Sequence, residues 1–223
     1  MANMKPLPTL AILGGTGKEG PGLALRWAAA CYKVIIGSRQ TEKARVTASE
    51  LNQQLGIDTI TGMHNSEAIH NADICVLTVV QSAHQAILEN LRDDLQGKIL
   101  VDTTARVDFR DPIPPEPPSA GRIAQEILGS GVRVVAAFQN VPAHALQKNL
   151  GQPLDLDVLA RADDEQAWQE VIKLAQAIGV RAYFAGNLDN AIVVEGLTSL
   201  LISLNQQHGV KTASVGITGI DSQ

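Results

Sequence analysis

The chain has 223 residues, of which 45% are hydrophobic and only 3% aromatic, and its formal net charge is −5. This size allows one large domain or one and a half, and the acidic balance with few aromatic residues argues against a nucleic-acid ligand. The apolar runs are shorter than a membrane span, the first residues lack the apolar region of a signal peptide, and Cys31 and Cys75 lack zinc-binding spacing. We therefore expect a cytoplasmic protein that binds neither membranes nor a metal.

The chain begins with a short apolar run and a glycine-rich turn. Leu10–Leu13 has the length of a buried strand, and Gly15, Gly17 and Gly20 follow it with G-x-G-x-x-G spacing. Leu23–Ala30 then has the composition of a helix. Strand, glycine turn and helix in this order are typical of a dinucleotide site, because the glycines allow a tight turn, close approach of a pyrophosphate and close helix–strand packing. We expect free N–H groups at the start of the helix to face the phosphates.

Short strands alternate with helices along the next hundred residues. The expected strands are 32–37, 58–61, 74–80, 98–102 and 132–138, and the expected helices between them are 41–55, 66–72, 82–95 and 119–128. Ser82 would cap the third of these helices, with Ala83, Ile87 and Leu91 facing the core. The alternation predicts an α/β fold, a Rossmann-type doubly wound parallel sheet, with residues 1–145 as an NADP-binding domain.

Residues 146–223 are expected to form a smaller, mainly helical C-terminal domain. It would hold strands at 156–160 and 180–184, a helix at 164–178 and a long helix over Leu188–Gln207. That last helix is apolar nearly all round, so its own domain or a second subunit must cover it, and we expect a homodimer. Within the first part, Asp111–Pro118 holds five prolines and reads as a stiff surface loop.

The end of the second strand indicates which dinucleotide is bound. Folds that bind NAD usually place Asp or Glu there, to accept hydrogen bonds from the ribose 2′-hydroxyl. This chain has Ser38 and Arg39 instead, with Lys43 one helical turn further on. A guanidinium can form a bidentate contact with a phosphate, and a serine hydroxyl can donate to it. The sequence therefore predicts NADP.

Few side chains are placed to act as a general acid or base. His84 and His144 follow the fourth and sixth strands, but a histidine at that edge is more often a ribose or amide contact than a catalyst. We predict no catalytic side chain. An acceptor that needs only positioning, such as a flavin-like ring, fits this pattern because the cofactor carries the chemistry.

Taken in order, the motifs resemble those of the coenzyme F420-dependent NADP reductases. The similar segments are Leu13–Gly17, Gly22–Arg26, Gly37–Arg39 with Lys43, Ile60–Met63, Asp73–Thr78, Ala137–Ala143 and Glu195–Thr198. No single segment is diagnostic, whereas the ordered set is fairly specific. The resemblance implies reversible hydride transfer between C4 of the nicotinamide of NADP(H) and C5 of the deazaflavin coenzyme F420, without a covalent catalyst.

The resemblance also implies the residues that hold the two molecules. By position, NADP contacts fall on Thr16, Gly17, Lys18, Glu19, Ser38, Arg39 and Lys43, and further contacts on Val79, His84, Ala105 and Ala143. Deazaflavin contacts fall near Val141 and around Val215–Ile217, so the C-terminal domain would carry the deazaflavin site and the dimer contact.

Three positions near the nicotinamide side depart from the best-known family pattern. Gln139 stands in place of a histidine, Ile192 in place of an arginine and Gly196 in place of a serine. Two other functions therefore stay open: an NADPH-dependent reductase of another acceptor, such as a flavin, an imine or a metal chelate, and a non-catalytic NADPH-sensing module. The physiological direction of transfer is also open.

Overall fold

The computed structural model describes residues 6–220, which are built around one sheet of eight strands in the order β3-β2-β1-β4-β5-β6-β7-β8. The strands are β1 (Leu10–Leu13), β2 (Val34–Ser38), β3 (Ile60–His64), β4 (Ile74–Leu77), β5 (Ile99–Asp102), β6 (Arg133–Ala136), β7 (Asp157–Ala162) and β8 (Arg181–Phe184). Strands β1 to β6 are parallel to one another. The strand order reverses between β1 and β4, and in such sheets ligands bind outside the carboxyl ends at this point.

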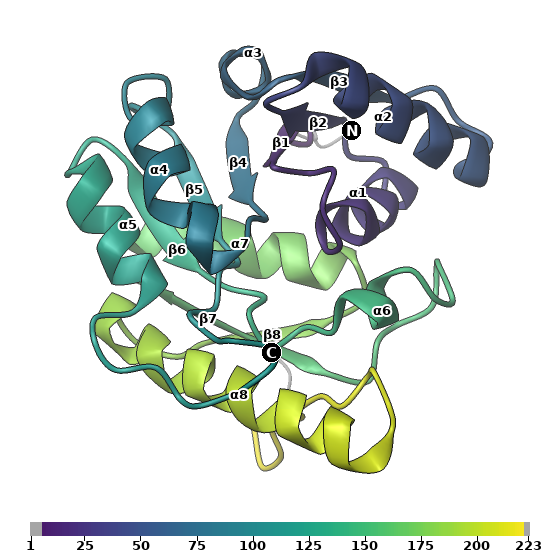
Figure 1. Ribbon diagram of the computed structural model, residues 1–223. Coiled ribbons are helices and arrows are strands. Elements are labelled where there is room, and N and C mark those ends of the chain that lie inside the picture. The colour runs from purple at the N-terminus through teal and green to yellow at the C-terminus, as the bar shows by residue number, and fades with distance from the viewer. Residues whose placement is uncertain (1–5, 221–223) are drawn as a thin grey trace.

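Helices cover both faces of the sheet (Figure 1). On one face pack α1 (Gly20–Ala29), α2 (Thr41–Leu55) and α7 (Glu165–Ala177), and on the other α3 (Asn65–His70), α4 (Gln81–Leu91) and α5 (Ala120–Leu128). The short helix α6 (Ala143–Leu146) lies beside α1. A 3₁₀ turn, Leu188–Asn190, leads into α8 (Ala191–His208), which contacts α5 and runs along the lower edge of Figure 1.

The strands are apolar on both faces because each face is covered by helices. Leu10 and Ile12 of β1 belong to the core shared with α1, α2 and α7, whereas Ala11 and Leu13 belong to the core shared with α3, α4 and α5. All four side chains are fully buried. This explains why the sequence shows continuous apolar runs rather than alternation.

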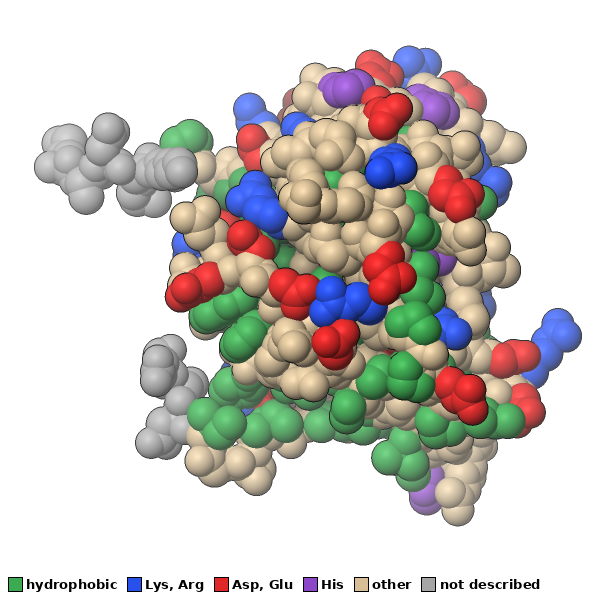
Figure 2. Space-filling view, turned by 90° about the vertical axis from the view of Figure 1, so that its left-hand side faces the viewer, with side chains coloured by type: hydrophobic (Ala, Val, Ile, Leu, Met, Phe, Trp, Pro, Cys, Tyr) green, Lys and Arg blue, Asp and Glu red, His purple; other side chains and the backbone are tan. Residues whose placement is uncertain are grey.

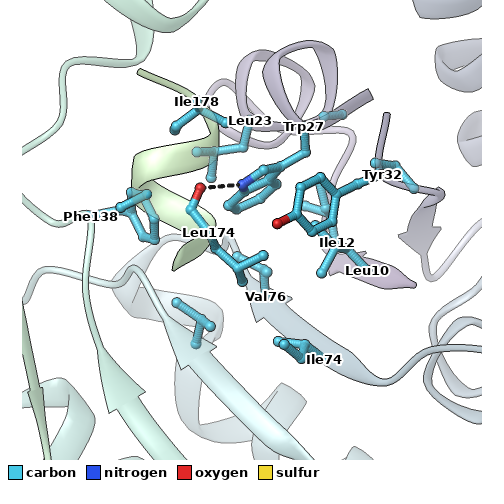
Figure 3. Packing of buried hydrophobic residues seen from close by; sticks show 14 of the residues in the cluster. Leu10, Ile12, Leu23, Trp27, Tyr32, Ile74, Val76, Phe138, Leu174 and Ile178 are labelled. Atoms are coloured by element: carbon cyan, nitrogen blue, oxygen red, sulfur yellow. Dashed lines mark hydrogen bonds between the residues drawn. The ribbon is translucent and has the colours of Figure 1, made fainter. Parts of the chain in front are cut away.

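Trp27 joins α1 to α7 within the first core (Figure 3). Its indole N–H donates to the carbonyl of Leu174 at 2.9 Å, and its ring meets Phe138 edge-to-face with centroids 5.8 Å apart. A buried tryptophan usually finds such a partner for its N–H group. The contact links the helix that follows the glycine turn to the C-terminal part of the chain.

The predicted Rossmann-type sheet is confirmed, but the prediction for α4 was wrong in its details. The helix begins at Gln81 after Val80, without a side-chain cap from Ser82. Its buried residues are His84, Leu88 and Leu91, so Leu91 faces the core as predicted. Ala83 and Ile87 are only half-buried, and His84 and Leu88, each one residue further along the helix, face the sheet in their place.

The C-terminal part extends the same sheet. Strand β7 runs antiparallel to β6, because the connection between them has only the short helix α6 and no long crossover helix. β8 is then parallel to β7, with α7 as the crossover. None of the helices formed by residues 6–220 combines the length and hydropathy of a membrane span.

Candidate functional site

The turn after β1 depends on Gly14. Its φ of +67° is left-handed, and a Cβ there would lie 2.6 Å from Cγ1 of Val79, which follows β4. Gly15 N–H donates to the carbonyl of Gly37 at 2.9 Å and so ties the turn to β2. The tight turn predicted at Gly15 is therefore made by Gly14, since only glycine adopts this conformation at no cost.

Gly15 and Gly20 instead bring α1 close to β1. A Cβ on Gly20 would lie 2.6 Å from Cα of Gly15, and a Cβ on Gly15 would lie 2.6 Å from the carbonyl oxygen of Ile12. Gly17 is exposed, and a Cβ there would meet only ordinary contacts at 3.5 Å or more. With half-buried Thr16, Gly17 forms the open part of the turn, in front of the start of α1, where N–H groups favour an anion.

At its carboxyl end, β2 places a hydroxyl and two cations at the same edge of the sheet as the glycine turn. Ser38 is nearly buried, and its Oγ accepts a hydrogen bond from the N–H of Gln40 at 3.2 Å. Arg39 and Lys43 are exposed, and within residues 6–220 neither forms an ion pair. Both side chains are therefore available to an anion at the carboxyl end of β2.

A buried ion pair lies at the carboxyl end of β5. Nε2 of His84 and Oδ2 of Asp102 are 2.7 Å apart, with the two residues 4% and 0% exposed. The N–H of Thr104 donates to the other carboxylate oxygen at 3.0 Å. Burial lowers the pKa of His84, but the charge and hydrogen bond of Asp102 and the charge of Glu195 raise it, and the net result is a raised pKa. The pair holds α4 against β5, and the predicted NADP contact of His84 stays a prediction.

The side chain of Glu19, just before α1, turns into the protein. Its Oε2 accepts a hydrogen bond from the hydroxyl of Thr103 at 3.1 Å, while Oε1 is buried without a partner among residues 6–220. Burial raises the pKa of Glu19 to about 8, the Thr103 hydroxyl lowers it and the Asp102 charge raises it. Glu19 is therefore neutral near pH 7 and does not repel an anion at the glycine turn.

Gln139 links β5, β7 and α8 at the carboxyl ends of the parallel strands. Its amide nitrogen donates to the carbonyl of Asp102 at 3.0 Å, and its amide oxygen accepts from Arg161 at 2.7 Å. The hydroxyl of Thr198 on α8 donates to the Gln139 carbonyl at 2.9 Å. Burial lowers the pKa of Arg161 to about 9, and the charge of Glu195 raises it. Both polar atoms of the Gln139 amide are thus used within the protein.

Glu195 ties α8 to the segment that follows β5. Its carboxylate accepts hydrogen bonds from the N–H groups of Arg106 at 3.1 Å and Ala120 at 2.7 Å. Burial raises the pKa of Glu195 to about 7, and these two donors lower it. The long helix therefore carries a fully buried acid that fixes its position.

Asp157 attaches two distant segments to the start of β7. Its carbonyl accepts from the amide of Asn140 at 2.7 Å, and its N–H donates to the carbonyl of Val215 at 2.9 Å. Its carboxylate accepts from the N–H of Ile217 at 2.5 Å and pairs with Arg181 at 2.7 Å. The loop that contains Val141 and the segment around Val215 are thereby held at one place.

The structure brings several predicted residues together and keeps others apart. Gly17, Lys18 and Ala143 line one cavity, Val79 touches the glycine turn, and Ala105 is half-buried beyond β5. Sequence reasoning missed Asp102, Thr103, Asp157 and Arg161. The run of polar residues that begins at Asp102, at the end of an apolar strand, could have indicated Asp102 and Thr103.

Comparison with known proteins identifies the family. Residues 9–106 match the family model described as NADP oxidoreductase, coenzyme F420-dependent. A protein named F420-dependent NADP reductase from Methanothermobacter thermautotrophicus is 40% identical over 224 residues, which cover 96% of each chain. The chain belongs to the F420-dependent NADP reductase family. A protein of the same name from Methanocaldococcus jannaschii is 39% identical over 95% of this chain and 99% of its own length.

A solved structure supports the fold of this F420-dependent NADP reductase family member. The crystal structure of a proposed F420-dependent NADP reductase from Arthrobacter sp. FB24 is 24% identical, with a TM-score of 0.80. The match covers 96% of this chain and all of the other. This match shows the fold, whereas the 40% identity to the Methanothermobacter thermautotrophicus protein confirms the family predicted from the ordered motifs.

Proposed function

We propose that the protein is an oxidoreductase that transfers hydride directly and reversibly between NADP(H) and the deazaflavin coenzyme F420. The observation that carries this proposal is the 40% identity, over 96% of both chains, to a protein named F420-dependent NADP reductase. The cytoplasmic location expected from the sequence is part of the proposal, and cell fractionation tests it.

The residues at the carboxyl ends of β1 and β2 fit NADP. The exposed Gly17 leaves room for a pyrophosphate in front of α1, where a side chain would intrude. Ser38, Arg39 and Lys43 provide a hydroxyl and two cations where an acidic residue would favour NAD. We infer that the turn binds the pyrophosphate and that these three residues bind the ribose 2′-phosphate.

The C-terminal part supplies walls for a planar ring. We propose that residues 146–223 act as the smaller domain, and that the deazaflavin lies between the loop at Val141 and the segment Val215–Ile217. Support comes from Asp157, which anchors both segments through Asn140 and Val215. Because these hydrogen bonds already order the segment Val215–Ile217, less conformational entropy is lost when the ring binds.

Positioning is the main contribution of the protein to this reaction. When both molecules are bound, the nicotinamide supplies a hydride and the deazaflavin accepts it. The buried acids and histidine at this edge, Glu19, His84, Asp102 and Glu195, all bond to protein groups, so we assign no catalytic residue. The glycine turn with Ser38 and Arg39 would hold the NADP(H), and the segments at Val141 and Val215 would hold the deazaflavin. Hydride transfer would need these residues to bring the two reacting carbons to within about 3–3.5 Å and to exclude water.

Isotope transfer tests the proposed function. NADPH that carries deuterium at the transferable C4 position should reduce F420 and deliver the label to C5 of the deazaflavin. Label that washes out into water would contradict direct transfer. If F420 shows no absorbance change while a flavin, an imine or a ferric chelate is reduced, the protein is instead an NADPH-dependent reductase of that acceptor. Binding of NADPH without any reduction would favour the sensing module.

Arg39→Ala tests the preference for NADP. The variant should lose about 1.5–3 kcal/mol of NADPH binding, roughly a 10- to 150-fold rise in Kd, because a charge-assisted contact with the 2′-phosphate is lost. NADH binding should change little, and Arg45→Ala on the exposed side of α2 serves as the matched control. Equal losses for both dinucleotides would contradict the assignment. Titrations followed by the fluorescence of the reduced nicotinamide measure the six affinities, those of NADPH and NADH for the parent and the two variants.

We also propose a homodimer formed through α8. The helix buries Ala191, Val194 and Leu201, but it exposes Val193 and Leu200 by 68% and 56%. The proline-rich loop continues this surface with Phe109 and Ile113, which are also largely exposed, and it is bonded to α8 through Ser199 and Gln206. Figure 2 shows hydrophobic side chains gathered along the lower part of the molecule, where α8 lies. An apolar surface shared by two elements is typical of a subunit contact.

Leu200→Asp on α8 should convert the dimer to a monomer. The charge would be buried without a partner in the contact, whereas in a monomer it stays in water. Val46→Asp, at a 49% exposed apolar site on α2, is the matched control and should stay dimeric. Light scattering at micromolar concentration measures the mass. A monomeric parent protein, or a dimeric Leu200→Asp variant, would contradict this interface.

A further inference from the structure

A cavity of about 350 Å³ lies between the glycine turn, α6 and the segment that follows α8. Its lining residues are Gly17 and Lys18 from the turn, Ala143, His144 and Gln147 from α6 and its end, and Lys211 from the C-terminal segment. Helix α6 packs tightly on α1, since a Cβ on Gly22 would lie 2.6 Å from Cβ of Leu146. The cavity thus joins the proposed NADP side of the molecule to its C-terminal part.

The lining carries positive charge only. Lys18 and Lys211 are cations, and His144 adds an imidazole ring; all three side chains are exposed. Among the residues that the structure describes, no Asp or Glu lines this cavity, although the chain has 23 acidic against 18 basic residues. A concave site with one sign of charge in a chain of opposite net charge favours an anionic ligand.

The cavity adjoins the proposed ring site on two segments. His144 follows Val141 on the connection after β6, and Lys211 precedes Val215 on the C-terminal segment. Asp157 holds these two segments together through its bonds to Asn140 and Val215. A ligand whose ring lies at Val141 and Val215 would therefore have its remaining groups within reach of His144 and Lys211.

We propose that this cavity binds the anionic side chain of coenzyme F420, with Lys211 and His144 as contacts. Beyond its ribityl group that side chain carries a phosphodiester and glutamate carboxylates, which accept hydrogen bonds from a lysine ammonium and from a histidine ring N–H. The inference rests on the proposed function and adds to it a second, electrostatic part of the deazaflavin site. Gly17, Lys18 and Ala143 line the cavity too but are also predicted NADP contacts, so they do not distinguish F420 from NADP, and the proposal depends on His144 and Lys211.

Two substrates distinguish contacts to the ring from contacts to the side chain. One is F420 itself, and the other is the deazaflavin riboside, which lacks the phosphate and the glutamates. In Lys211→Gln, we expect the KM for F420 to rise about 5- to 10-fold, since one charge-assisted contact is lost at an exposed site. The KM values for the riboside and for NADPH should stay unchanged. Lys33→Gln, an exposed lysine before β2 at the opposite end of the sheet, is the matched control.

The outcomes are distinct. A rise in the F420 KM confined to Lys211→Gln, and weakened by added salt, supports the proposal. Equal rises for F420 and the riboside, a rise for NADPH, or no change would each overturn it. A parent protein that reduces F420 and the riboside with the same KM would overturn the inference while leaving the proposed function in place. If NADPH reduces neither deazaflavin, the proposed function fails and this inference fails with it.

Discussion

Arg26→Met is expected to destabilise the protein by about 3–5 kcal/mol, the cost of leaving buried polar groups without their charged partner. Arg26 lies on α1 and is 4% exposed. Its guanidinium donates to the backbone carbonyls of Ala145, Leu146, Lys148, Gln152 and Ile178. Methionine fills a similar volume but donates to none of them, so the end of α6, the loop after it and the end of α7 lose their common donor.

The free energy of unfolding from denaturant titration measures this effect. Arg45→Met removes an exposed arginine from α2 and should change stability by no more than about 0.5 kcal/mol. A loss below about 1 kcal/mol for Arg26→Met would show that water satisfies the freed carbonyls. Because α6 carries His144, a folded variant should also bind F420 less tightly.

Local patterns were sufficient to predict the first half of the fold. The run Leu10–Leu13, the glycines after it and the helix that follows are short-range signals, and each appears where the sequence places it. Ser38 and Arg39 are also a short-range signal, because their position directly after an apolar strand is visible in the sequence. Only the tight-turn role moved, from Gly15 to Gly14. Gly14 has a φ of +67° and lies against Val79, a contact that the local spacing of glycines does not reveal.

Long-range partners explain what the sequence did not reveal. The sequence predicted His84 as a ligand contact and not as part of the inward face of its helix, yet it points inward, where Asp102 lies 2.7 Å away. Arg26 reads as an ordinary helix residue, and its partners lie more than a hundred residues away. The antiparallel direction of β7 likewise depends on a connection with no long helix. Such features follow from tertiary contacts, which periodicity and propensity do not encode.

Glu19→Gln is expected to flatten the dependence of stability on pH. In the folded protein burial raises the pKa of Glu19 from 4.5 to about 8, so between these values the folded chain keeps a proton that the unfolded chain releases. Stability therefore falls as the pH rises through this window. Glutamine resembles the protonated acid, can still bond to Thr103 and does not titrate. The variant should match the parent near pH 4 and exceed it by about 2–5 kcal/mol at pH 9, since one pKa unit corresponds to about 1.4 kcal/mol.

Denaturant titrations of both proteins at several pH values between 4 and 9 measure the difference. Glu195, whose pKa is raised to about 7, contributes a loss of the same sign, but it is present in parent and variant and cancels in the comparison. Glu50→Gln on the exposed side of α2 is the matched control and should give a curve parallel to that of the parent. If the curves for Glu19→Gln and the parent are also parallel, Glu19 is ionised in the folded protein. Its carboxylate would then lie close to the pyrophosphate site as a negative charge, and Glu19→Gln should instead strengthen NADPH binding.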